Sequence, residues 1–122
     1  MSNLPRPPAH LEPYVRILGV EGAVTFFLTY GGSELYIPRT PRPGAPLVDL
    51  LGIEAAGNLG AAADRLPRRV PTAKPWLARV WAAQGLRVAQ IARRLHVSDV
   101  SVRKWLKGET LDAGEDRQLP LI

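Results

Sequence analysis

The sequence predicts a mainly α-helical fold with a short β-strand or two, in which an N-terminal helix-strand dimerisation region precedes a C-terminal helix-turn-helix bundle. Three observations support this fold class. Apolar residues recur at helical spacing over residues 11–30, apolar and polar residues alternate over residues 33–38, and two short apolar stripes flank a turn within residues 87–107. With 122 residues, the chain has the length of one compact domain or two very small ones.

The first part of the chain predicts an arm followed by an interrupted helix. Residues 1–10 contain three prolines and no apolar periodicity, which is typical of a flexible arm. Residues 11–30 predict a helix that Gly19 breaks and that Gly31-Gly32 ends, because glycine adopts the left-handed backbone cheaply. In residues 33–38, Leu35 and Ile37 face one side, which predicts a strand ended by Pro38. The proline-rich residues 40–46 predict a stiff linker.

Residues 47–71 resemble residues 11–38 at an offset of thirty-three positions. ILGVEGA at 17–23 aligns with LLGIEAA at 50–56, and Ile37-Pro38 aligns with Val70-Pro71. This indicates two helix-strand units within residues 11–72, although matches this short also arise by coincidence. Because a pair of strands is only marginally stable by itself, we expect this region to complete its core against a second copy of the chain, as a homodimer.

Residues 73–108 predict the helix-turn-helix domain. Its first helix carries two tryptophans, Trp76 and Trp81, at a spacing that favours core packing over an open platform for stacking single-stranded bases. The next two helices bury complementary stripes, formed by Val88, Ile91, Ala92, Leu95, Val102, Trp105 and Leu106. Ser98 is placed to cap the last helix, and Gly108 is placed to end it.

The segment IARRLHVSDVSVRKWLKG resembles the helix-turn-helix shared by many phage and bacterial transcription regulators. It departs from that motif at His96, where the motif usually has glycine in a left-handed turn position. Histidine adopts this backbone at some cost, so we expect a turn that is either strained or differently shaped. We interpret His96 as a turn residue rather than a metal ligand or a catalytic group.

The predicted site is the solvent face of the two helices, and its expected ligand is double-stranded DNA. Residues near the start of a recognition helix reach base edges in the major groove, which makes Asp99, Val100 and Arg103 the candidates for sequence readout. The remaining polar residues suit the phosphate backbone or flank the readout positions: Arg87, Gln90, Arg93, Arg94, Ser98, Ser101, Lys104 and Lys107. Arg68, Arg69 and Lys74 are expected to extend this footprint. For each basic residue, plain surface solvation is the alternative.

Charge is segregated along the sequence. The net charge is +5, but residues 65–107 hold eleven basic side chains and one acidic side chain, whereas residues 1–64 and 108–122 are each net acidic. A block of this kind favours a polyanionic partner, because each phosphate that Lys or Arg neutralises releases condensed counterions.

A wider resemblance covers roughly residues 11–107. GGSELYIP, the helices before it and the C-terminal helix-turn-helix are similar to the Mor transcription activator family of phages. The resemblance implies a dimer formed by the N-terminal half, strands near its linker, two helix-turn-helices on a dyad-symmetric promoter element, and recruitment of RNA polymerase. Glu34 to Pro38 match the family's strand, and Ser98 to Lys107 match its recognition helix.

Other classes of function find little support in the sequence. The chain has no cysteine and two isolated histidines, so we expect no metal and no cofactor, and we find no phosphate loop or nucleophile elbow of an enzyme. No apolar run could cross a membrane or form a signal-peptide core, so we expect a cytoplasmic, nucleoid-associated protein without a membrane partner. Two alternatives stay open: a phage DNA-packaging factor similar to a terminase small subunit, and an antitoxin-like adaptor that binds an acidic protein. Residues 109–122 form an acidic, then apolar, tail of unassigned role.

Overall fold

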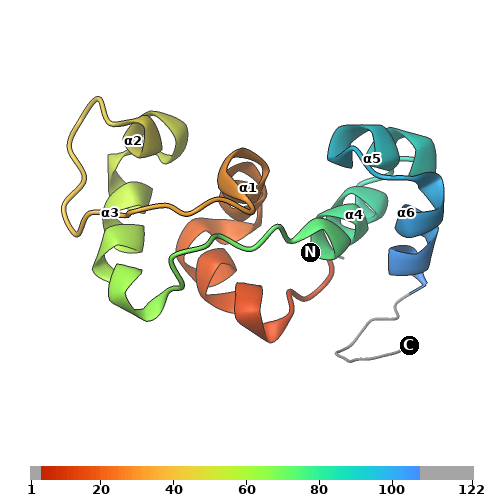
Figure 1. Cartoon of the computed structure of the whole chain (residues 1–122), viewed down its shortest axis with the longest axis horizontal. Helices are drawn as coiled ribbons and strands as arrows, with labels where there is room; N and C mark the ends of the chain where they lie inside the picture. The colour runs from red at the N-terminus through yellow and green to blue at the C-terminus, as the bar shows by residue number, and fades with distance from the viewer. Residues whose placement is uncertain (1–3, 108–122) are drawn as a thin grey trace. The chain divides into compact units, whose positions relative to one another are not determined.

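The computed structural model describes residues 4–107, and this part of the chain is mainly helical, as the sequence predicts. It divides into two compact units (Figure 1). One unit comprises residues 9–73, and the other joins the residues before Ala9 to those from Lys74 onward. The predicted helix stop at Gly108, the tail at 109–122 and the first three residues of the predicted arm lie outside the described residues. No helix between residues 4 and 107 is both long enough and apolar enough to cross a membrane.

The first unit contains two kinked helical segments. A 3-10 turn, η1 (Ala9–Leu11), leads into α1 (Glu12–Tyr30), which kinks at Gly19 because this residue takes φ 75° and ψ 169°. After the proline-rich linker come α2 (Pro46–Leu51), α3 (Ile53–Ala61) and η2 (Ala63–Arg65). Gly52 separates α2 from α3 with φ 92° and ψ 158°, a backbone that favours glycine.

The core of this unit is built around aromatic side chains of α1. The ring of Tyr14 stacks on that of Phe26, with centroids 5.7 Å apart, and meets the ring of Phe27 edge-on at 5.2 Å. Such pairs add to the free energy of burying the rings. The aliphatic part of this core comprises Leu11, Ala23, Leu47, Ala56, Leu59, Ala62, Val70 and Ala73.

The predicted strands are not formed, and we correct this part of the prediction. Residues 32–35 and 68–70 do lie side by side, but within residues 4–107 they make only one isolated antiparallel bridge, between Glu34 and Arg69, and no named strand. Their backbone hydrogen bonds run from Gly32 N–H to Val70 O, from Val70 N–H to Ser33 O, and from Leu35 N–H to Arg68 O. The pairing stops early because the N–H groups next in register, those of Gly31 and Leu66, donate instead to Phe27 O and Ala63 O at the ends of α1 and η2.

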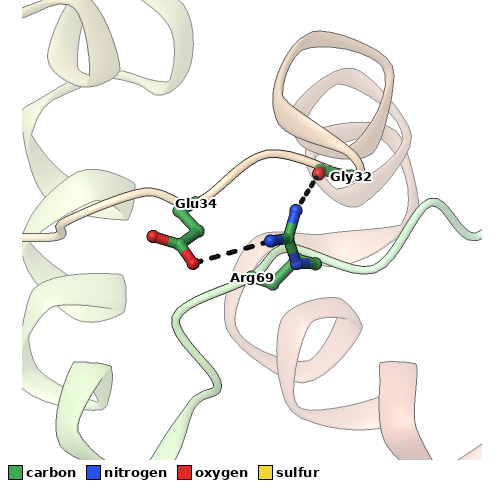
Figure 2. Close-up of polar contacts among 3 residues, drawn as sticks. All are labelled: Gly32, Glu34 and Arg69. Atoms are coloured by element: carbon green, nitrogen blue, oxygen red, sulfur yellow. Dashed lines mark hydrogen bonds and ion pairs between the residues drawn. The ribbon is translucent and has the colours of Figure 1, made fainter.

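The side chain of Arg69 adds two contacts to this bridge (Figure 2). Its Nη1 donates a hydrogen bond of 2.8 Å to the carbonyl oxygen of Gly32, and its Nη2 lies 3.6 Å from a carboxylate oxygen of Glu34. Both charged side chains are largely exposed to solvent, so the ion pair contributes little to stability. The hydrogen bond to Gly32 joins the two backbone segments directly.

The second unit is a bundle of three helices: α4 (Lys74–Ala83), α5 (Val88–Leu95) and α6 (Asp99–Leu106), each packed against the other two. Trp76 and Trp81 are buried, which confirms their predicted place in the core. Their buried neighbours are Leu77, Val80, Ile91, Ala92, Leu95 and Val102. Three residues of the predicted stripes differ from the prediction because they are only half-buried: Val88 at the start of α5, and Trp105 and Leu106 at the end of α6.

Part of the predicted arm has defined partners. The indole Nε1 of Trp76 donates a hydrogen bond of 3.2 Å to the carbonyl oxygen of Pro5, and residues 9–11 form η1. Pro5 therefore packs with the three-helix unit, which satisfies an indole donor that would otherwise be buried without an acceptor.

Candidate nucleic-acid interface

The turn between α5 and α6 is a Schellman motif with histidine in its left-handed position. His96 takes φ 58° and ψ 47°. Its N–H donates to Arg93 O at 3.4 Å, and the next N–H, that of Val97, donates to Ala92 O at 3.0 Å. These two bonds satisfy carbonyls at the end of α5, where no further turn of helix would do so. The predicted left-handed backbone at His96 is therefore present, although this position usually favours glycine.

Ser98 caps α6, as predicted. Its Oγ accepts a hydrogen bond of 3.1 Å from the backbone N–H of Ser101, and its backbone is extended, with φ −78° and ψ 157°. The cap satisfies one of the free N–H groups at the start of the helix, and Asp99 places a negative charge at the positive end of the helix dipole. The first turn of α6, which carries the predicted readout residues, is thus held in place locally.

The two sides of α6 differ sharply in exposure. Val102 is fully buried, whereas Val100 is 69% exposed. One exposed stripe runs along the helix, because Val100 lies three and four residues before Arg103 and Lys104, and Lys107 lies four and three residues after them. The guanidinium of Arg103 lies 3.8 Å from the carboxylate of Asp99, one turn earlier, with both side chains exposed.

The predicted residues of α5 form a second polar stripe, at positions 90, 93 and 94, and all three are exposed. Two of them also have structural contacts. The Oε1 of Gln90 accepts a hydrogen bond of 2.9 Å from the backbone N–H of Arg87, and the guanidinium carbon of Arg94 lies 5.2 Å from the centre of the Trp81 ring. Gln90 therefore stabilises the start of α5, and Arg94 is held over an aromatic face.

All eleven predicted site residues thus lie on α5 or α6 or directly beside them, because Arg87 and Ser98 precede the two helices and Lys107 follows α6. Ten are exposed and Ser101 is partly exposed. Of the three residues expected to extend the footprint, Lys74 begins α4 in the same unit, whereas Arg68 and Arg69 belong to the other unit.

The sequence alone did not point to one residue that supports the site. Arg79, on α4, donates a hydrogen bond of 3.2 Å from Nε to the backbone carbonyl of Trp105, in the last turn of α6. This contact places a positive charge at the negative end of the helix dipole and joins α6 to the core helix. The signal in the sequence was a lone arginine within the apolar segment WLARVW.

The electrostatic character of this unit is strongly positive. Residues 74–107 contain eight basic side chains and one acidic side chain, Asp99. Among residues 4–107 there is no cluster of three histidine or acidic side chains that could hold a metal ion.

No protein-family model matches the sequence, and comparison with curated proteins and with solved structures finds no match either.

Proposed function

We propose that the chain is a sequence-specific, double-stranded DNA-binding transcription regulator that places α6 in the major groove. One observation carries the proposal: α6 is capped at Ser98 and buried along Val102, while Val100 and Arg103 stand exposed near its start. Arginine pairs bidentately with guanine, and an apolar side chain meets the thymine methyl, so these two residues can read bases. The surrounding basic residues suit phosphates, which set register without specifying sequence.

The direct test begins with selection of bound duplexes from a random pool by the full chain. The selected element and a scrambled duplex of equal composition are then compared in binding titrations at several salt concentrations. We expect the selected element to bind about 10³-fold or more tightly, with affinity that falls steeply as salt rises. Equal affinity for both duplexes at every salt concentration would contradict sequence-specific recognition.

Regulation of transcription, and activation in particular, is proposed on the resemblance to the Mor activators. In this proposal the bound chain contacts RNA polymerase at a phage or prophage promoter. A transcription assay with purified polymerase on a template that carries the selected element tests it. An increase in transcript supports activation, whereas a decrease indicates repression by the same DNA-binding unit.

A further inference from the structure

The residues 9–73 unit contains two matching halves with the same local geometry. The aligned glycines, Gly19 and Gly52, both take positive φ with extended ψ, at 75°, 169° and 92°, 158°. Each lies between two helical stretches, and a Cβ added to either would meet no atom within 4 Å. The aligned alanines, Ala23 and Ala56, are both fully buried. The two helical segments therefore share a kink and an inward face as well as a sequence pattern.

The two halves also pair in a register that two-fold symmetry requires. In an antiparallel pair related by a two-fold axis, one residue must lie opposite its own equivalent. The sequence offset of thirty-three makes Leu35 and Arg68 equivalents, and the backbone N–H of Leu35 donates to the carbonyl of Arg68 at 3.0 Å. The bridged pair, Glu34 and Arg69, is the next pair along the ladder (Figure 2).

The two halves also make close backbone contacts at the ends of their helices. A Cβ on Gly31, after α1, would lie 3.1 Å from the carbonyl oxygen of Pro71 in the second half. A Cβ on Gly60, in α3, would collide with the backbone of the first half, at the carbonyls of Pro38 and Arg39. Pro38 and Pro71 are themselves equivalent at the offset of thirty-three. Each half thus places a glycine against a proline carbonyl of the other, although the two glycines themselves are not equivalent at this offset.

We infer that residues 9–73 form a two-fold pair within one chain, so that a single copy binds a single, undivided DNA element rather than a palindrome. Only residues 39–45 separate the first half from α2, and a short linker gives its two ends an effective concentration in the millimolar range. Pairing within the chain therefore outcompetes pairing between copies at micromolar concentration. A chain with one helix-turn-helix then supplies one recognition helix, and one half-site, for each bound copy.

This inference differs from the expected homodimer and rests, for its DNA part, on the proposed function. Its closing experiment has one measurement without DNA and one with DNA. Sedimentation equilibrium of the full chain at micromolar concentration should give the mass of one copy, 13.3 kDa. Titration of the selected element should give one chain per duplex. A duplex with two inverted copies of the element should bind two chains independently, with Kd values that agree within about twofold.

A pair of matched variants tests the closure of the two halves. Gly60→Ala brings a methyl group against the backbone of Pro38 and Arg39, whereas Gly57→Ala, in the same helix, adds a methyl group with no atom within 4 Å. Because both changes raise helix propensity equally, only the contact separates them. We expect Gly60→Ala to lower the Tm by several degrees relative to Gly57→Ala.

The outcomes that overturn the inference are distinct from those that overturn the proposed function. A mass of two copies without DNA, cooperative binding to the inverted duplex, or equal Tm values for the two alanine variants would each overturn the single-chain pair. A monomeric chain that shows the expected Tm difference but binds no duplex would instead overturn the proposed function and leave the pairing of the two halves supported.

Discussion

The Nε of Arg79 donates a hydrogen bond to the backbone carbonyl of Trp105, which joins the middle of α4 to the last turn of α6. Arg79→Met keeps much of the aliphatic length but removes the donor and the charge. We expect the free energy of unfolding to fall by about 1–3 kcal/mol, because a charged donor lost from a partly buried carbonyl leaves that carbonyl unsatisfied. Arg93→Met, at an exposed position of α5, is the control and should change stability by less than about 0.5 kcal/mol. Equal losses in urea titrations would show that the Arg79 contact is not formed in solution.

His96→Gly should stabilise the helix-turn-helix. The left-handed backbone at φ 58° and ψ 47° costs an L-residue about 1–2 kcal/mol. Glycine avoids this cost, but it lowers stability by about 0.5–1 kcal/mol because its unfolded chain has more conformational freedom to lose. The net gain is therefore up to about 1.5 kcal/mol. His96→Ala is the matched control, because it removes the exposed imidazole but keeps the Cβ. A glycine variant no more stable than the alanine variant in thermal unfolding would refute backbone strain at this turn.

Local features of the fold could be predicted from the sequence because each has a nearby cause. The kink at Gly19, the left-handed His96 and the cap at Ser98 follow from residue types and spacings within one or two helical turns. The strands could not be predicted correctly, because alternation at Leu35 and Ile37 indicates a strand only if the partner segment can extend the ladder. The next donor of that segment, the N–H of Leu66, is bonded to Ala63 O instead.

Features that depend on tertiary packing were harder to predict. The exposure of Trp105 depends on how far α4 and α5 reach along α6, and the Arg79 contact joins residues twenty-six positions apart. The residues of the candidate site were easier to predict than the contacts that hold them in place. Exposed residues of a helix follow from its buried stripe, but the contact of Arg94 with Trp81 requires that α4 and α5 be packed together.

Tyr14→Phe should maintain or raise the stability of the first unit. The hydroxyl of Tyr14 is buried and finds no hydrogen-bond partner among residues 4–107. An unsatisfied buried hydroxyl costs about 1–3 kcal/mol, so its removal should be neutral or stabilising by up to that amount. A loss of more than about 1 kcal/mol in urea titrations would indicate that a group or a water molecule does bind the hydroxyl.

The same tyrosine predicts a dependence of stability on alkaline pH. Desolvation by burial raises the pKa of Tyr14 above its usual value of 10.0. A raised pKa in the folded state means that the unfolded chain loses its proton first, so the stability from a neutral Tyr14 is complete below pH 10 and falls as pH rises above it. Tyr14→Phe should therefore lose less stability than the natural chain between pH 9 and pH 11 in matched unfolding curves. Identical slopes for the two proteins would contradict this assignment.

The stability lost when each tryptophan is replaced by alanine should increase with its burial. Trp76 is 2% exposed and donates to Pro5, whereas Trp105 is half-buried at the end of α6. We expect Trp76→Ala to lower the free energy of unfolding by about 3–5 kcal/mol, because it leaves a large cavity in the core. Trp105→Ala should lower it by about 1–3 kcal/mol. Differential scanning calorimetry of the two variants gives the comparison. A loss at Trp105 as large as that at Trp76 would mean that the end of α6 is covered in solution.

Arg103 and Lys104 are adjacent on α6 and should affect DNA binding differently. Both are exposed, but Arg103 lies nearer the start of the helix, where side chains reach base edges, and its ion pair with Asp99 is exposed and weak enough to exchange for a base. Arg103→Ala should cost about 1–3 kcal/mol on the selected element and much less on a scrambled duplex, which relaxes sequence preference. Lys104→Ala should weaken both duplexes alike and reduce the slope of affinity against salt by about one ion. Titrations of the two variants against both duplexes measure these differences directly. Equal losses on the two duplexes for Arg103→Ala would assign Arg103 to the phosphate backbone and move sequence readout to Val100 and Asp99.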